Sequence, residues 1–190
     1  MKLSVKGKQI DVGDALREHV ETQLQDIVGK FFSDSIDAQV TFSRQAHLFC
    51  TDITVHAGRG LVLQSTGEAA DAYPSFDAAA DRMAERLRRH KNRLKKHHMD
   101  QSRKEAVEVQ SFVLEASQED IKEDGTDNPV VVAEMTTPVA HLTVSEAVMR
   151  LDLSGESALL FHNMAHGGLN MVYRRSDGHI GWVDPQGQAA

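Results

Sequence analysis

The chain has 190 residues, of which 41% are hydrophobic and 26% are charged, and its formal net charge is −7. This length allows one or two globular domains, and the composition excludes a mostly disordered chain. No stretch approaches the roughly 20 apolar residues of a membrane-spanning helix, and the first ten residues lack the apolar core of a signal peptide. A cytoplasmic protein with no membrane partner is therefore expected.

The charge is unevenly distributed along the chain. Residues 1–104 contain 17 Lys and Arg against 14 Asp and Glu, whereas residues 105–190 contain 4 against 14. The first part therefore carries +3 and the second −10. Because salt screens charges beyond a Debye length of about 8 Å, a local basic surface on the first part can bind a polyanion although the whole chain is acidic.

Alternating and helical patterns predict five elements in residues 2–63. Residues 2–6 alternate as a strand, and a helix with a possible N-cap at Asp11 continues to Gly29. Three more strands are expected at residues 38–42, 49–55 and 61–63, the last two joined by a tight turn at 56–60. Cys50 is the only cysteine, so no intrachain disulfide is possible. We favour a structural role for Cys50, as a small residue within a strand, over a role as a nucleophile.

A basic helix is predicted over residues 71–98, with Asp71 as its cap. One face carries an apolar stripe at helical spacing, which we expect to be buried. Its members are Tyr73, Phe76, Ala80, Met83, Leu87, His90 and Leu94.

Cations follow the same rhythm on this helix, about 100° from the apolar stripe. Eight cations fall within fifteen residues. A solvated helix face is one interpretation, but like charges this dense repel unless a polyanion offsets them, which favours a phosphate-binding surface. His97 and His98 add partial charge, or belong to a frayed end. The eight cations are Arg82, Arg86, Arg88, Arg89, Lys91, Arg93, Lys95 and Lys96.

These elements predict the fold class α+β. Residues 1–104 form a β-α-β-β-β-α sandwich in which two helices lie against one face of a four-stranded sheet. Residues 105–138 are acidic and lack a helical stripe, which predicts a flexible linker, with Val113 or residues 130–132 docking as a short strand as an alternative.

Residues 139–190 predict a small C-terminal α+β domain. A capping box at Thr143 to Glu146 begins a helix that ends at Gly155. Strands are expected at 158–163, 169–174 and 180–183, with turns at 166–168 and 176–178. About 50 residues give a poor single core, so the domain is expected to pair with its own copy; a monomer docked on the first domain is the alternative.

No pattern of a catalytic site emerges. His162 and His166 have the spacing of helical metal ligands, but they fall on a strand and a Gly-Gly turn. The motifs GxxxxGK[ST], CxxC and GxSxG are missing from the sequence. We therefore expect that the protein is not an enzyme and that it has no catalytic residue, cofactor, bound metal or small-molecule substrate.

Three segments resemble one known family, the long form of the ribosome hibernation-promoting factor, in the ribosome-associated inhibitor group. They are the opening VKGKQIDVGDALREHVETQL, the helix segment DRMAERLRRHK, and the tail LTVSEAVMRLDLSGESALLFHNMAHGGLNMVYRRSDGHIGWVDP. The tail is the most specific of the three. Together they cover both predicted domains and omit only the linker.

The resemblance implies a non-enzymatic stress-response factor that regulates translation. Its first domain would bind rRNA of the small ribosomal subunit, in the channel of messenger and transfer RNA, and its second domain would form a homodimer that pairs ribosomes. A general double-stranded-RNA-binding module fused to a dimerisation domain is the alternative. The implied RNA-binding residues are Arg82, Arg86, Arg89, Lys91, Arg93, Lys95, Lys96, Lys8, Arg17 and Lys30. The implied dimerisation residues are Phe161, Val172, Tyr173 and Trp182.

Overall fold

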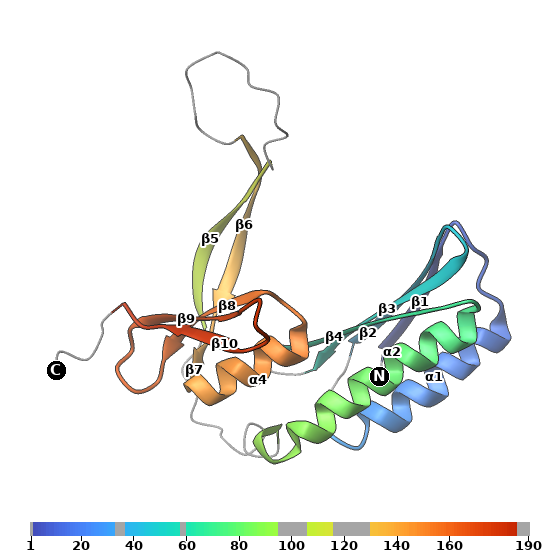
Figure 1. Ribbon diagram of the computed structural model, residues 1–190, viewed down its shortest axis with the longest axis horizontal. Helices are drawn as coiled ribbons and strands as arrows, with labels where there is room; N and C mark the ends of the chain where they lie inside the picture. The colour runs from blue at the N-terminus through green and yellow to red at the C-terminus, as the bar shows by residue number, and fades with distance from the viewer. Residues whose placement is uncertain (1, 33–36, 58–59, 95–105, 116–129, 186–190) are drawn as a thin grey trace.

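The first half of the chain forms an open four-stranded sheet with two helices on one face (Figure 1). This computed structural model describes residues 2–32, 37–57, 60–94, 106–115 and 130–185. The elements of this half are β1 (Lys2–Lys8), α1 (Asp14–Val28), β2 (Asp37–Gln45), β3 (Leu48–Ala57), β4 (Leu61–Ala69) and α2 (Ala72–Arg89). The predicted β-α-β-β-β-α sandwich is confirmed.

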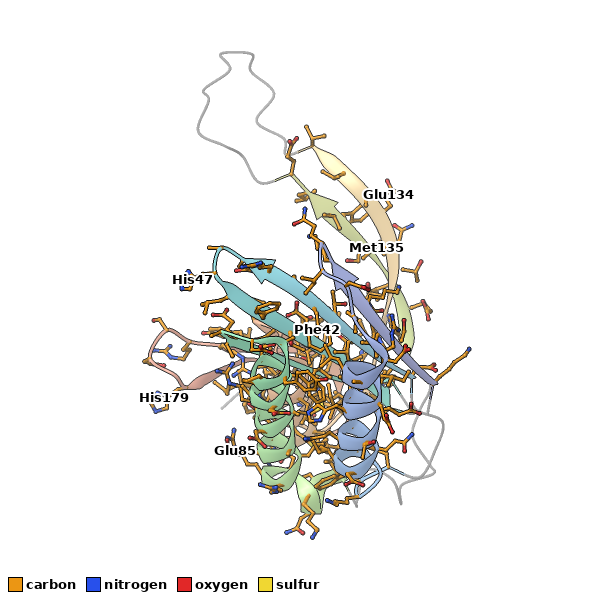
Figure 2. All side chains as sticks on the ribbon, turned by 90° about the vertical axis from the view of Figure 1, so that its right-hand side faces the viewer. Phe42, His47, Glu85, Glu134, Met135 and His179 are labelled. Carbon is orange, nitrogen blue, oxygen red and sulfur yellow. The ribbon has the colours of Figure 1, made fainter. Side chains whose placement is uncertain are left out.

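The sheet order is β1-β2-β3-β4, with β1 and β2 parallel and the other neighbours antiparallel. Strands β1 and β4 therefore point the same way, and α1 and α2 return alongside each other. Alternate residues face the helices, for example Val40 and Phe42 on β2 and Ile53 on β3, all almost fully buried. Phe42 is labelled in Figure 2. One face of the sheet holds the core, and the other carries polar side chains.

Small residues bring α2 close to the sheet. The hydroxyl of Ser65 donates to the backbone oxygen of Ala79 at 2.7 Å, and the hydroxyls of Thr51 and Ser75 are 2.7 Å apart. A Cβ atom on Gly67 would meet backbone atoms of Ser75 and Ala79. The helix axis is therefore set by backbone contact at β4 rather than by long side chains.

Two helix ends differ from the sequence prediction. Helix α1 begins after Gly13, without a side-chain cap, and not after Asp11. The Asp71 carboxylate does cap α2, accepting from the Tyr73 amide, but the helix ends at Arg89. Lys91–Leu94 form a separate helical turn. The apolar stripe is buried from Phe76 to Leu94, whereas Tyr73 at its start is exposed.

Two paired strands stand within the stretch that was expected to be a linker. They are β5 (Val107–Leu114) and β6 (Val131–Val139), an antiparallel hairpin that projects from the body of the molecule (Figure 1). We call these two strands the β5–β6 arm. The flexible chain predicted for residues 105–138 therefore has regular structure in its described residues, and strand pairing spans the two ends of the acidic stretch.

The C-terminal part folds as a second four-stranded sheet with one helix. Its elements are β7 (His141–Leu142), α4 (Val144–Ser154), β8 (Ala158–Asn163), β9 (Leu169–Arg174) and β10 (Ile180–Val183), in sheet order β10-β9-β8-β7. The predicted capping box of Thr143 and Glu146 and the left-handed cap at Gly155 are both present. These features confirm the small α+β domain expected here.

Helix α4 packs on both halves of the molecule. Ala147 and Leu151 belong to a cluster with Phe161 and Val172 of the second sheet. Met149 and Leu153 belong to the core cluster of the first half, and α4 lies along β4 (Figure 1). Among the described residues, no helix is long and apolar enough to cross a membrane.

We predict that Gly67→Ala lowers the free energy of unfolding by about 2–3 kcal/mol, because the added methyl group meets backbone of α2, which cannot rotate away. Urea unfolding followed by circular dichroism measures this. Gly13→Ala, where a Cβ meets nothing within 4 Å, is the control, with an expected cost below about 1 kcal/mol. Equal losses in the two variants would contradict the close approach.

Candidate nucleic-acid interface

Three arginines of α2 follow one another at helical spacing, and the first two of them contact the edge strand β4. The Nη1 atom of Arg82 donates to the backbone oxygen of Thr66 at 2.7 Å, and that of Arg86 donates to the backbone oxygen of Gln64 at 2.9 Å. A backbone carbonyl has no net charge, and a guanidinium has five N–H donors. These contacts therefore orient the two arginines without neutralising them. Arg82 is exposed, whereas Arg86 is half-buried and its charge also interacts with Asp152 of α4.

Arg89, the third of the row, is held by acids of the same chain. Its Nη1 atom lies 3.2 Å from Oδ2 of Asp152 on α4, and its Nη2 atom lies 3.7 Å from Oε1 of Glu85. The same Asp152 oxygen accepts a 2.8 Å hydrogen bond from Nε2 of His90. Arg174 of β9 approaches the other carboxylate oxygen at 3.6 Å. Asp152 is thus the acid that joins the two halves at the end of the basic row.

Burial alone would raise the pKa of the Asp152 carboxyl. The hydrogen bond from His90 and the charges of His90, Arg89 and Arg86 outweigh this effect, so the pKa lies below its usual value. The carboxylate is therefore charged at neutral pH. It neutralises part of the positive field at the C-terminal end of α2.

The remaining cations of this region lie on the last turn of α2 and beyond its end. Arg88, Lys91 and Arg93 are exposed, and Nη1 of Arg93 lies 3.3 Å from Nδ1 of the buried His90. Because α2 ends at Arg89, Lys91 and Arg93 do not continue its arginine row, which corrects the expectation of one straight stripe. Lys95, Lys96, His97 and His98 lie outside the described residues.

Lys30 joins this end of the domain. Helices α1 and α2 run alongside each other, and His19 and Asp77 form a 2.8 Å contact between them. Helix α1 ends at Val28, so Lys30 lies in the turn just beyond its C-terminal end, and its side chain is exposed. Both helices therefore have cations at or just beyond their C-terminal ends.

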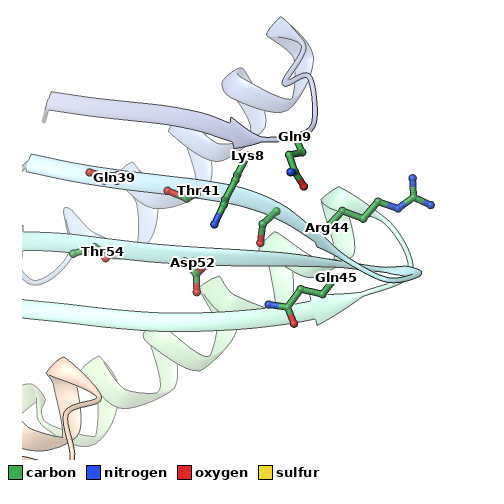
Figure 3. Close-up of a pocket in the computed structure, with 9 residues that line it drawn as sticks. Lys8, Gln9, Gln39, Thr41, Arg44, Gln45, Asp52 and Thr54 are labelled. Atoms are coloured by element: carbon green, nitrogen blue, oxygen red, sulfur yellow. The ribbon is translucent and has the colours of Figure 1, made fainter. Parts of the chain in front are cut away.

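Lys8 and Arg17 stand apart from this group. Both lie at the end of the domain where the helices begin, and Nη1 of Arg17 donates to the backbone oxygen of Val5 at 3.1 Å. Lys8 lines a hollow of about 650 Å³ on the open face of the sheet (Figure 3). The structure therefore does not gather all the predicted RNA-binding residues on one surface. The other residues lining the hollow are Gln9, Gln39, Thr41, Ser43, Arg44, Gln45, Asp52 and Thr54.

The four predicted dimerisation residues lie in different environments. Phe161 and Val172 are fully buried beneath α4, so in this conformation they support the second sheet from within and cannot contact another chain. Trp182 is about half exposed, and its Nε1 atom donates to Oδ1 of Asn170 at 2.9 Å. Tyr173 lies on the opposite face, away from α4, with its ring over Gly181.

Sequence reasoning missed the open face of the second sheet. On each strand most of the residues that alternate with the buried ones are apolar, and Leu160, Leu169 and Val183 among them are exposed. The exception is His162, which lies on this face and stacks on His141 of β7. The alternation itself was the available signal, but it does not say which face the helix covers. The members of this open face are Leu160, Leu169, Met171, Tyr173 and Val183.

The described residues contain no group of three His, Cys, Asp or Glu able to hold a metal ion. His162 faces the backbone oxygen of Gly167 through Nδ1 at 3.1 Å, and His166 contacts Asp184 at 3.2 Å. Burial, together with the charges of Glu68 and Asp52, raises the pKa of the Cys50 thiol. A protonated thiol is a poor nucleophile, which supports a structural role for Cys50.

Comparison with known proteins identifies the family. Residues 3–95 match the family model described as Sigma 54 modulation protein / S30EA ribosomal protein, and residues 126–181 match that of its C terminus. Over its whole length the chain is 40% identical to the ribosome hibernation promotion factor of Bradyrhizobium diazoefficiens, of which it covers 97%. The chain belongs to the ribosome hibernation promotion factor family.

Another member of the ribosome hibernation promotion factor family, from Rhizobium meliloti, is 36% identical over 97% of both chains. The crystal structure of the Thermus thermophilus Protein Y N-terminal domain is 26% identical, with a TM-score of 0.43, covering 47% of this chain and 98% of that one. Membership gives this chain a ribosome-associated, non-enzymatic role, with the ribosome as its partner.

We predict that Asp152→Ala costs about 1.5–3 kcal/mol of unfolding free energy at neutral pH, because it leaves the buried His90 without its charged acceptor. A lowered carboxyl pKa contributes stability above the ordinary value of about 3.9, and this contribution is lost as the pH falls through the lowered pKa. The difference between wild type and variant, measured by urea unfolding, should therefore be constant above about pH 5 and shrink in stronger acid. Asp26→Ala, on the exposed side of α1, is the control; a difference that persists in strong acid would contradict the role of the Asp152 charge.

Proposed function

We propose that this protein binds the small ribosomal subunit in the channel of messenger and transfer RNA, inhibits translation there, and pairs ribosomes through its C-terminal domain. The observation that carries the proposal is the row of Arg82, Arg86 and Arg89 on α2. Two of these arginines are oriented by uncharged carbonyl oxygens, so their positive charge remains available to phosphate. Ribosome binding also implies a cytoplasmic protein.

A pre-oriented arginine row suits folded RNA. Double-stranded RNA is recognised by shape and phosphate position because its deep major groove hides the base edges. A guanidinium presents a planar fork of donors that matches two phosphate oxygens. Side chains that are already held in place lose less conformational entropy on binding. The backbone contacts of Arg82 and Arg86 are therefore expected to raise the affinity for RNA.

The domains have separate tasks in this proposal. The first domain, residues 1–104, binds rRNA, and residues 139–190 supply pairing. Docking through α4 uses one side of the C-terminal domain and leaves the open face of its sheet available to a second copy. The C-terminal domain can therefore dock on the first domain of its own chain and still pair with a second copy.

Co-sedimentation tests ribosome specificity. The protein should pellet with small ribosomal subunits in preference to an equal mass of plain duplex RNA. Binding should weaken with salt at a slope of roughly −3 in log K against log salt, if about half of the eight cations neutralise phosphates. Equal binding to any duplex would instead indicate a general double-stranded-RNA module.

We predict that reversing Arg86, Arg89 and Arg93 to Glu abolishes ribosome binding while the fold is kept, because each substitution turns a phosphate attraction into a repulsion. Gradient sedimentation with ribosomes measures binding, and circular dichroism checks the fold. The control reverses Lys2, Lys6 and Arg44 to Glu, the same change in net charge at other places on the domain. Retained sedimentation of the first variant, or equal loss in both, would count against the α2 surface.

Ending the chain at Pro138 should preserve ribosome binding and translation inhibition but remove paired ribosomes. Sucrose-gradient profiles separate single from paired ribosomes, and a cell-free translation assay measures inhibition. Paired ribosomes that persist with the shortened chain would show that pairing does not need residues 139–190.

A further inference from the structure

The β5–β6 arm projects from the second sheet, which β6 contacts through β8 (Figure 1). Beyond that contact most side chains of the arm are exposed. A two-stranded hairpin by itself is marginally stable in water. The arm reaches about 27 Å at 3.4 Å per residue, far enough to contact another molecule. The arm therefore needs a contact with another surface to be stably folded.

The two faces of the arm differ in polarity. On one face Val107 pairs with Val139, Val109 with Thr137, Ser111 with Met135, and Val113 with Ala133. On the other face Glu108 pairs with Pro138, Gln110 with Thr136, and Phe112 with Glu134. Glu134 and Met135 mark the two sides of β6 in Figure 2. The arm is thus amphipathic, and its apolar face is exposed at Val107, Val113 and Met135, whereas Val139 at its base is buried.

The exposed apolar side chains of the described structure are concentrated in two places. Of fourteen large exposed ones, eight lie on or beside the arm, five lie in the C-terminal domain, and Tyr73 is the remaining one. Of the eight, Val107, Val113 and Met135 lie on the apolar face of the arm, and of the five, Leu160, Leu169 and Val183 lie on the open face of the second sheet. Concentrations of exposed apolar side chains mark interaction sites in soluble proteins. The eight are Val107, Phe112, Val113, Leu114, Val130, Val131, Val132 and Met135; the five are Leu160, Met164, Leu169, Trp182 and Val183.

We propose that the apolar face of the arm covers the open face of the second sheet in another copy of this chain, whose own arm covers the first copy in return. This rests on the proposed pairing through the C-terminal domain and names the surfaces involved. Such an exchange is two-fold symmetric, so one arm and one sheet face per chain satisfy both copies. Both surfaces are apolar, and packed sheets bury such faces about 10 Å apart.

The connection to the sheet explains why the arm serves a second copy rather than its own. Strand β6 ends at Val139 and β7 begins at His141, so only Ala140 separates them. A chain reversal between strands needs at least about two residues. The arm therefore cannot fold back flat over its own sheet, and Figure 1 shows it leading away from that sheet.

The first test places a charge on each face of the arm. Met135→Glu should weaken dimerisation at least about 100-fold, because it buries an unpaired carboxylate at the contact. Thr136→Glu, one residue away on the polar face, should leave the dimer unchanged. Both positions are exposed in the single chain, so neither variant disturbs the core. Sedimentation equilibrium of the full chain measures the change; a dimer that survives Met135→Glu overturns the exchange.

The second test locates the contact directly. In a Cys50→Ala background, a chain with Met135→Cys and a separately tagged chain with Leu160→Cys are mixed and oxidised. The exchange predicts a mixed disulfide between the two chains, and its loss when Thr136→Cys replaces Met135→Cys. If disulfides between two Met135→Cys chains form more readily than the mixed disulfide, the arms contact each other and the proposal is overturned.

Leu160→Glu separates this proposal from the proposed pairing function. If Leu160→Glu breaks the dimer and Met135→Glu does not, the sheet face pairs chains without the arm, and only the exchange is overturned. If both variants remain dimeric, or if the wild-type chain is monomeric at every concentration, pairing through the open face is overturned with it. Loss of the dimer in both, with Thr136→Glu intact, supports the exchange.

Discussion

The packing of α2 against β3 and β4 decides where the cations of the first domain stand. The helix lies so close to the sheet that backbone meets backbone at Gly67, and buried hydroxyls of Thr51 and Ser65 hold it there. With its apolar side fixed, the adjacent side must project over β4. Arg82 and Arg86 then find the carbonyl oxygens of that strand, which gives the row a defined geometry before any RNA is present.

The end of this row serves two purposes. Asp152 of α4 binds Arg89 and His90, and Met149 and Leu153 bury their side chains in the core of the first domain. A phosphate that binds Arg89 has to displace Asp152 or share the guanidinium with it. If the first domain binds RNA as proposed, this binding and the docking of the C-terminal domain compete for a single guanidinium.

The sequence predicted the layers of the fold well, because each depends on a local period. The last three strands were predicted with the bounds that the structure has, and the cap of α4 followed from Thr143 and Glu146. The end of α2 was missed because the stripe continues without a change of period through His90 to the buried Leu94. Periodicity detects which side of a segment is buried but not a turn within it.

The candidate surfaces were less predictable, because each depends on contacts between distant segments. Pairing of β5 with β6 joins the two ends of an acidic stretch whose composition indicated a linker. Phe161 and Val172 were expected at the dimer contact, yet α4 covers their side of the sheet and leaves the other side open. Alternation alone assigns residues to two faces without saying which face is outside.

The contacts of Arg82 and Arg86 with β4 also bear on solubility. An edge strand offers unpaired backbone groups to the strands of other molecules, and such edges promote aggregation unless charge or another element covers them. Along β4, two guanidinium groups occupy carbonyl oxygens and α4 lies beside the strand. In the free protein, the side chains proposed to hold RNA therefore also act as gatekeepers against edge-to-edge strand addition.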